Sequence, residues 1–263
     1  MPNWDKGGIF RLMANGVELE GRCFGPSPRE APTIILLHEG LGSIRLWRDF
    51  PEKLVAATGL GVFAYSRQGY GTSDPVSLPR PINYMDLEAE KSVPDVLSAV
   101  GVKDYILLGH SDGASIATIY AGLEQARGGL EAVILMAPHF FAEQESVDAI
   151  SKIRKTYDEG LRDKLAKYHL HVDCAFLGWN ETWLQPDFMT WNIERFLPDI
   201  RVPVLMIQGE DDEYGTFRQV EALKAGLKGT AKVEYLPDCG HAPHQEKETE
   251  TLDAIKSFID RLI

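Results

Sequence analysis

The stretch Tyr105-Ile-Leu-Leu-Gly-His-Ser-Asp-Gly-Ala-Ser-Ile-Ala-Thr-Ile-Tyr120 contains a G-x-S-x-G pentapeptide at residues 109–113. Residues 105–108 before it form an apolar, strand-like run, and residues 114–121 after it form a helical run of small residues. A serine on such a sharp strand-to-helix turn exposes its hydroxyl above the positive N-terminal end of the helix. The pattern therefore predicts that Ser111 is a nucleophile.

A serine hydroxyl needs a general base, and the base needs a third group that orients it. Residues 233–246 read as a strand followed by a Gly-His loop, which makes His241 the predicted base. Residues 204–214 read as an apolar strand that ends at Gly209 and continues into an acidic loop. Four carboxylates in that loop compete for the role of the acid: Glu210, Asp211, Asp212 and Glu213.

Strands alternate with helices along the chain, which favours a parallel sheet covered by helices on both faces. Eight strands are expected, at Phe10–Ala14, Val17–Phe24, Thr33–Leu37, Gly61–Tyr65, Tyr105–Leu108, Ala132–Ala137, Val204–Gln208 and Lys232–Leu236. Three helices are expected in the first half of the chain, at Leu46–Ala57, Leu87–Val100 and Asp112–Gln125.

From about Val17 to the C-terminus, the chain resembles the α/β-hydrolase superfamily, in the branch with a helical cap inserted after the sixth strand. Five motifs carry this resemblance in the expected order: the loop 36–43, the glycine-rich turn 66–73, the Ser111 turn, the Gly209 loop and the Gly240-His241 loop. The order nucleophile, acid, base is that of this fold. The resemblance implies a mostly parallel twisted sheet flanked by helices, with a core of residues 1–137 and 199–263 and a cap of residues 138–198.

The resemblance also selects the acid and the base. In similar proteins the acid lies three residues after the loop glycine, which selects Asp212 and leaves Asp211 in reserve. The base follows a glycine, which selects His241 over its neighbour His244. His110, at the variable position of the pentapeptide, is expected to be a packing residue.

An oxyanion hole built from two backbone N–H groups is implied at Gly40 and Asp112, with Leu41 in reserve for Gly40. The chain departs from the usual pattern here, because Glu39 stands where similar proteins have a glycine, and Asp112 where they usually have an apolar or amide side chain. Carboxylates that pointed into the hole would destabilise an oxyanion. We expect both to point away, toward loop N–H groups or Arg67; the alternative is a substrate with a cationic or hydrogen-bond-donating group.

Residues 138–198 interrupt the alternation and are rich in aromatic side chains. Most of these are expected to pack the cap onto the core, with Trp179 and Trp183 lining an apolar substrate pocket and His169 contacting the substrate. His169 and His171 alone are weak grounds for a metal site, and none is expected. The apolar spacing predicts two cap helices, at Val147–Tyr157 and Leu161–Tyr168.

Length, charge and cysteine content exclude some classes of partner. The 263 residues suit one α/β domain with an insertion, and the formal charge of −12 argues against nucleic acid or an anionic membrane as a partner. No run of 18 apolar residues and no signal-peptide pattern is present, and three unpaired cysteines suggest a reduced, cytoplasmic protein. A small-molecule ester substrate is the expected partner, and a homodimer is left open.

The predicted activity is hydrolysis of a small or medium carboxylic ester, including lactones and thioesters, without a cofactor. One alternative is a C–C bond hydrolase of a ring-cleavage-type diketone, which shares this fold, cap and triad. Another is a non-enzymatic ligand receptor on the same scaffold, because a fold alone does not fix a function. A serine nucleophile argues against haloalkane dehalogenases and epoxide hydrolases, which use aspartate.

Overall fold

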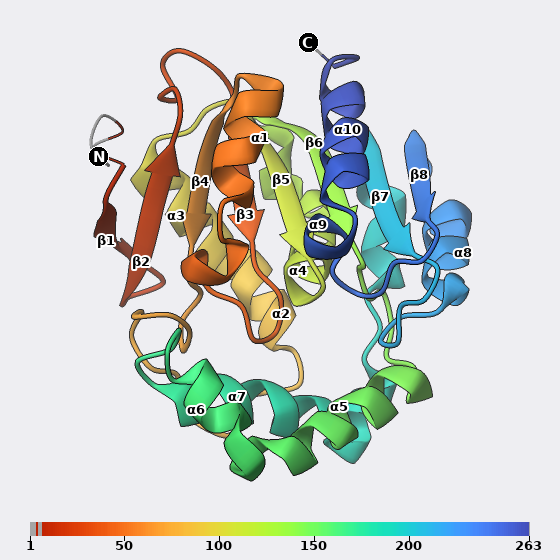
Figure 1. The fold of residues 1–263 in the computed structure, drawn as a ribbon. Helices are drawn as coiled ribbons and strands as arrows, with labels where there is room; N and C mark the ends of the chain where they lie inside the picture. The colour runs from red at the N-terminus through yellow and green to blue at the C-terminus, as the bar shows by residue number, and fades with distance from the viewer. Residues whose placement is uncertain (1–3, 5–6, 263) are drawn as a thin grey trace.

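In the computed structural model, which describes residue 4 and residues 7–262, an eight-stranded sheet runs through the molecule in the order β1-β2-β4-β3-β5-β6-β7-β8 (Figure 1). β2 pairs antiparallel with β1 and β4, and all other pairs are parallel. The strands are β1 (Ile9–Ala14), β2 (Val17–Phe24), β3 (Thr33–Leu37), β4 (Gly61–Tyr65), β5 (Tyr105–His110), β6 (Leu130–Met136), β7 (Val204–Gly209) and β8 (Ala231–Leu236). All eight predicted strands are confirmed, within two residues at each end.

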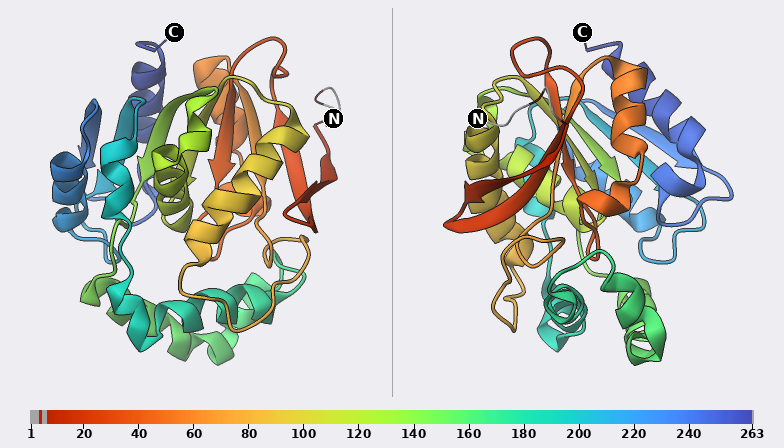
Figure 2. Two further views of the ribbon diagram at one scale, coloured as in Figure 1. Left: turned by 180° about the vertical axis from the view of Figure 1, so that it is seen from behind. Right: turned by 60° about the vertical axis from the view of Figure 1, so that its left-hand side comes forward.

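Helices cover both faces of this sheet, and this explains why the central strands are buried along their whole length and are mainly apolar. α1 and α10 pack on one face, and α3, α4 and α8 pack on the other (Figures 1 and 2). The core helices are α1 (Phe50–Thr58), α2 (Tyr84–Leu87), α3 (Val93–Val100), α4 (Asp112–Gly122), α8 (Phe217–Gly226), α9 (Pro243–Glu246) and α10 (Glu248–Ile259), with short turns η2 (Ile44–Trp47), η3 (Glu88–Ser92) and η4 (Glu124–Arg127).

All three helices predicted in the first half of the chain are divided. The one expected at Asp112–Gln125 ends as α4 at Gly122, and its last residues belong to the 3-10 turn η4. The helix expected at Leu46–Ala57 is the 3-10 turn η2 followed by α1, and the one expected at Leu87–Val100 passes through the π-helical turn η3. η3 ends two residues before Pro94, whose missing N–H cannot continue the regular ladder of hydrogen bonds.

The segment of residues 138–198, here called the cap segment, leaves the core after β6 and returns to it before β7. Its helices lie across the carboxyl ends of the strands, at the bottom of Figure 1. They are α5 (Gln144–Thr156), η5 (Tyr157–Leu161), α6 (Arg162–Leu165), α7 (Val172–Trp183) and η6 (Pro186–Thr190), and η7 (Glu194–Asp199) completes the return. α7 was not predicted from the sequence. Across the described residues, no helix is long and apolar enough to span a membrane.

Candidate active site

Ser111 lies on the turn between β5 and α4, at the carboxyl edge of the sheet. Its backbone has φ 53° and ψ −120°, a conformation that costs a non-glycine residue about 1–3 kcal/mol. Glycines on both sides allow this turn to pack closely against its surroundings. A Cβ on Gly113 would lie 1.9 Å from the carbonyl oxygen of Leu37, and one on Gly109 would lie 2.3 Å from the carbonyl oxygen of Gly113.

The structure brings Ser111, His241 and Asp212 together from three loops. Nε2 of His241 lies 2.9 Å from Oγ of Ser111, and Nδ1 of His241 lies 2.9 and 3.0 Å from the two carboxylate oxygens of Asp212. The carboxylate of Asp212 also accepts hydrogen bonds from the N–H of Tyr214 (2.8 Å) and from the amide of Gln208 (2.7 Å). These contacts fix the ring of His241 in the orientation that a general base for Ser111 requires.

Burial and charge affect the two ionisable partners in opposite ways. Burial raises the pKa of Asp212, but the ring of His241 and the N–H of Tyr214 outweigh this effect and lower the pKa to about 2. Burial lowers the pKa of His241, but the carboxylate of Asp212 outweighs it and raises the pKa above its ordinary value. Asp212 is therefore a permanent carboxylate near neutral pH, and its charge makes His241 a stronger base.

Among the described residues, the competing acids of this loop form no hydrogen bond or ion pair with His241. Glu210, Asp211 and Glu213 are exposed, whereas the side chain of Asp212 is 1% exposed. The structure thus separates Asp212 from the three alternatives that the sequence left in the same loop.

The loop after β3 carries Gly40, which lines the same cavity as Ser111. His38 orders this loop, because its Nδ1 donates to the carbonyl oxygen of Glu39 (2.7 Å) and its Nε2 accepts from the N–H of Arg67 (3.0 Å). The N–H groups of Gly40 and Asp112 donate no hydrogen bond within the described part of the chain. Both residues line the cavity, and their unpaired amides are the candidate donors to an oxyanion.

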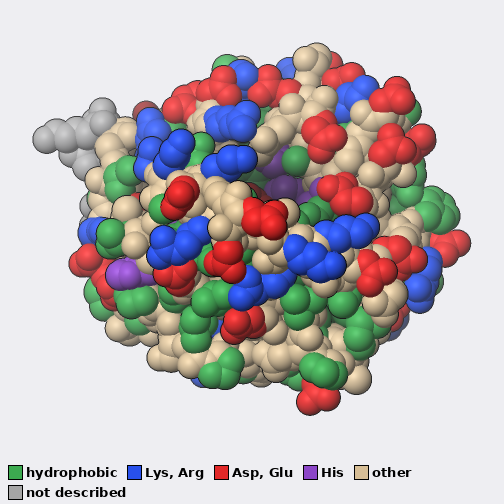
Figure 3. Space-filling view, turned by 60° about the horizontal axis from the view of Figure 1, so that its bottom comes forward, with side chains coloured by type: hydrophobic (Ala, Val, Ile, Leu, Met, Phe, Trp, Pro, Cys, Tyr) green, Lys and Arg blue, Asp and Glu red, His purple; other side chains and the backbone are tan. Residues whose placement is uncertain are grey.

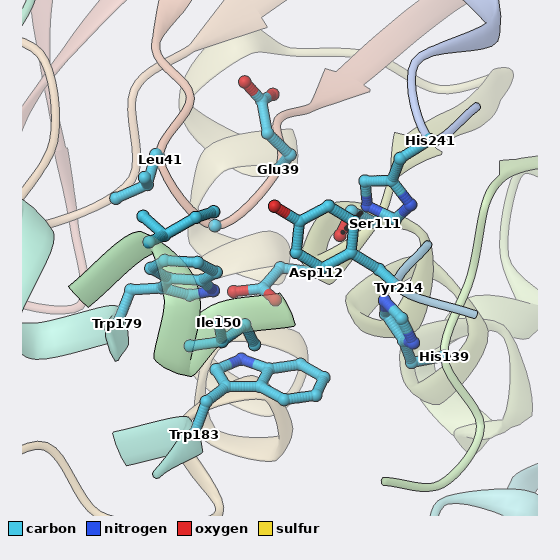
Figure 4. Close-up of a pocket in the computed structure, with 12 residues that line it drawn as sticks. Glu39, Leu41, Ser111, Asp112, His139, Ile150, Trp179, Trp183, Tyr214 and His241 are labelled. Atoms are coloured by element: carbon cyan, nitrogen blue, oxygen red, sulfur yellow. Dashed lines mark hydrogen bonds between the residues drawn. The ribbon is translucent and has the colours of Figure 1, made fainter. Parts of the chain in front are cut away.

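The two unusual carboxylates are engaged with the protein. Oδ2 of Asp112 accepts a hydrogen bond from the hydroxyl of Tyr84 and lies 3.7 Å from Nη2 of Arg67, and the side chain is buried. The expected pairing of Asp112 with Arg67 is therefore present. The carboxylate of Glu39 points away from Ser111 (Figure 4), toward His110 and not toward Arg67, which donates only to its backbone carbonyl (2.9 Å).

A cavity of about 120 Å³ lies over Ser111, between the sheet and the cap segment (Figure 4). Trp179 and Trp183, which the sequence analysis assigned to a substrate pocket, form part of the wall of this cavity from α7. On the face that the cap segment presents, histidine side chains are visible at the bottom of a hollow (Figure 3). The cavity is lined by Glu39, Gly40, Leu41, Ser111, Asp112, His139, Ile150, Ile153, Trp179, Trp183, Tyr214 and His241.

His169 was predicted to contact the substrate, and the structure gives it a different place. It does not line the cavity; its Nδ1 accepts from the N–H of Gly71 (3.0 Å), and its Nε2 donates to the carbonyl oxygen of Leu41 (3.0 Å). Both ring nitrogens are therefore used to tie the cap segment to the glycine-rich turn and to the loop of Gly40. Among the residues that the structure describes, no three His, Cys, Asp or Glu side chains are grouped to hold a metal.

Four residues of the cavity wall were not singled out from the sequence. Ile150 and Ile153 lie one turn apart on α5. The spacing of apolar residues predicted an apolar face on this helix, but not that the face lines the cavity. Tyr214 and His139 pack beside the ring of His241, with ring centroids 4.6 and 5.7 Å away. Of these two aromatic rings, Tyr214 could have been placed near the site from the sequence, because it lies two residues after Asp212.

Comparison with known proteins agrees with this fold. A model of the alpha/beta hydrolase family matches residues 34–254. The chain is 26% identical to a bifunctional esterase/perhydrolase of Acinetobacter calcoaceticus, over 92% of this chain and 96% of that protein, and 25% identical to the serine hydrolase BPHL of Mus musculus, over 95% and 85%. A solved 2-hydroxy-6-oxo-6-phenylhexa-2,4-dienoate hydrolase from Rhodococcus sp. strain RHA1 is 17% identical and superposes with a TM-score of 0.77, over 95% of this chain and 98% of that one. This chain belongs to the alpha/beta hydrolase family.

Proposed function

We propose that the protein is a serine hydrolase that cleaves a small or medium carboxylic ester through an acyl-enzyme. Ser111 attacks the acyl carbonyl while Nε2 of His241 takes the proton of its hydroxyl. The oxyanion is held by the N–H groups of Gly40 and Asp112. His241 then protonates the leaving oxygen, and a water molecule activated by the same ring releases the acid. Asp212 holds the tautomer of His241 and stabilises the imidazolium.

The observation that carries this proposal is the unbroken chain of contacts from Ser111 through His241 to Asp212, at 2.9 Å for each link. The nucleophile lies on a strained turn at the floor of a cavity, which is the arrangement that acyl transfer needs. The names of the esterase and serine hydrolase relatives support the same reaction class.

The cavity wall favours a neutral ester over an acidic diketone. Its charged members are Glu39 and Asp112, and within the described residues it includes no lysine or arginine side chain. An anionic substrate would therefore find no cation to compensate its charge. The remaining wall is mainly apolar and aromatic, which suits an uncharged acyl group.

Turnover of a chain-length series of p-nitrophenyl esters, with Ser111→Ala as the matched variant, tests this proposal. We expect hydrolysis of short and medium esters that requires Ser111, with a maximum at the acyl length that the cavity accepts. No Ser111-dependent turnover of any ester in the series would overturn the proposal.

A further inference from the structure

A second carboxylate and a second histidine meet beside the proposed triad. Glu39 precedes Gly40 in the loop after β3, and His110 is the last residue of β5, directly before Ser111. Nδ1 of His110 lies 3.6 Å from Oε2 of Glu39, and the side chain of His110 is buried. Neither side chain has a part in the proposed mechanism.

The hydrogen-bond partners of His110 restrict where its protons can be. Its Nε2 lies 2.7 Å from the carbonyl oxygen of His241, and a carbonyl can only accept, so Nε2 carries a hydrogen. In a neutral ring, Nδ1 would then be a bare acceptor. It is buried without a hydrogen-bond partner and would face the carboxylate of Glu39, lone pair against lone pair. A proton on Nδ1 would turn this costly contact into a favourable one.

The neighbours leave His110 as the group that can hold this proton. Burial lowers the pKa of His244 to about 3 and places the pKa of His38 well below its ordinary value, so both rings are neutral. A proton shared between a carboxylate and an imidazole stays on the imidazole, which is ordinarily the stronger base. The side chain of Glu39 is also 24% exposed, so its carboxylate keeps contact with water and can remain ionised. The titratable groups around the pair are His38, Arg67, His139, His169, His241 and His244.

We propose that Glu39 and His110 form a buried carboxylate–histidinium pair that positions the machinery of the proposed hydrolase. The pair joins three segments that are far apart in the sequence. Glu39 anchors the loop that presents the N–H of Gly40, and His110 holds the backbone of His241 and directly precedes Ser111. Both are positioning residues, because they act through the base and the oxyanion loop. This role rests on the proposed function, but the charged pair itself does not.

The protonation of His110 is measured directly by ¹⁵N NMR of the histidine rings, with Glu39→Gln as the matched variant. A glutamine amide can donate to Nδ1, so this variant keeps the contact and removes the charge. At about pH 7.5, where an ordinary imidazole is mostly neutral, we expect two protonated ring nitrogens on His110 in the wild type. In Glu39→Gln we expect only Nε2 to be protonated. A bare Nδ1 in the wild type would overturn the proposal.

Kinetics test the positioning role. His110→Leu removes the donor to the backbone of His241, and a small displacement of a catalytic group lowers kcat by about 10- to 100-fold. We expect KM to stay within about twofold, because the lost contact does not touch the substrate. His244→Leu is the control, because its ring packs 4.8 Å from that of His110 without bonding to His241.

Equal kcat losses in His110→Leu and His244→Leu would overturn the positioning role. A failure of the proposed function has a different signature, since the wild type would then show the charged pair by NMR but no Ser111-dependent ester turnover. If His110→Leu does not fold, the NMR comparison of the wild type with Glu39→Gln still decides the state of the pair.

Discussion

The cavity over Ser111 has two walls that are built differently. The sheet side carries polar groups on tight turns, and His241 and Asp212 there are held by hydrogen bonds at 2.7–3.0 Å. The cap side presents apolar and aromatic surface from α5 and α7. For the proposed hydrolase, this difference predicts that residues of the sheet side carry out the reaction and that residues of the cap side select the acyl group. Substitutions on the two sides should therefore change different kinetic parameters.

One close contact between the two walls limits their independence. A Cβ on Gly40 would lie 2.1 Å from Nε1 of Trp179, closer than atoms can approach. A glycine at this position thus allows the cap segment to close over the loop that presents the proposed oxyanion donor.

The largest effect should follow from Asp212→Asn on the sheet side. The amide cannot hold His241 in the required tautomer, and kcat should fall by about 10⁴-fold. Asp211→Asn is the matched control, because Asp211 is exposed and forms no hydrogen bond or ion pair with His241; its kcat should be close to that of the wild type. Steady-state kinetics on one activated ester compares them, and a larger loss in Asp211→Asn would show that the acid is misassigned.

Gly40→Ala should have the next largest effect, because it drives the two walls apart. The new Cβ meets the indole of Trp179, and the displaced loop should lower kcat/KM by about 10- to 100-fold. Gly128→Ala, with no atom within 4 Å of the new Cβ, is the control. The double variant Gly40→Ala/Trp179→Ala should recover part of the loss. If the second substitution brings no recovery, the clash is not the cause.

Trp179→Ala should act on substrate choice more than on rate. Removing an indole from the cap side enlarges the cavity, so the preferred acyl chain should lengthen, with a change in kcat/KM for long against short esters of about 10-fold. Turnover of the p-nitrophenyl series measures this ratio. An unchanged length preference together with a large loss of kcat would place Trp179 in the chemistry and contradict the division between the walls.

The smallest effect concerns pH. His241 must be neutral to act as the base, and Asp212 raises its pKa. As the pH is lowered, kcat/KM should therefore begin to fall at a higher pH than the ordinary imidazole pKa of about 6.5 would give. Asp212→Asn should move the acidic limb of the kcat/KM profile to lower pH, whereas Trp179→Ala should leave that limb in place. A pH profile of each variant checks both statements, and a limb that moves with Trp179→Ala would mean that the cap side influences the base.

The sequence could predict the features that depend on short stretches of the chain. The strands and the neighbourhood of Ser111, His241 and Asp212 depend on short-range patterns, namely apolar runs that end in glycine-rich turns, and these were read directly. The choice among the four carboxylates of the acid loop needed the resemblance to a known family, because only the folded chain distinguishes the buried Asp212 from its exposed neighbours.

The features that the sequence did not predict depend mainly on contacts between distant segments. α7 was missed because its residues Val172–Trp183 include a glycine and four aromatic or β-branched side chains before its final tryptophan, which weaken a helical pattern. His169 was assigned to the substrate, but its partners Gly71 and Leu41 lie about a hundred residues away in the sequence. The contact of Glu39 with His110 likewise has no local signal.

The central claim is that Ser111 is the nucleophile, and covalent labelling tests it most directly. A fluorophosphonate probe, followed by peptide mapping by mass spectrometry, should modify Ser111 in the wild type and leave Ser111→Ala unlabelled. Labelling of Ser111→Ala, or a modification that maps to another residue in the wild type, would contradict the account.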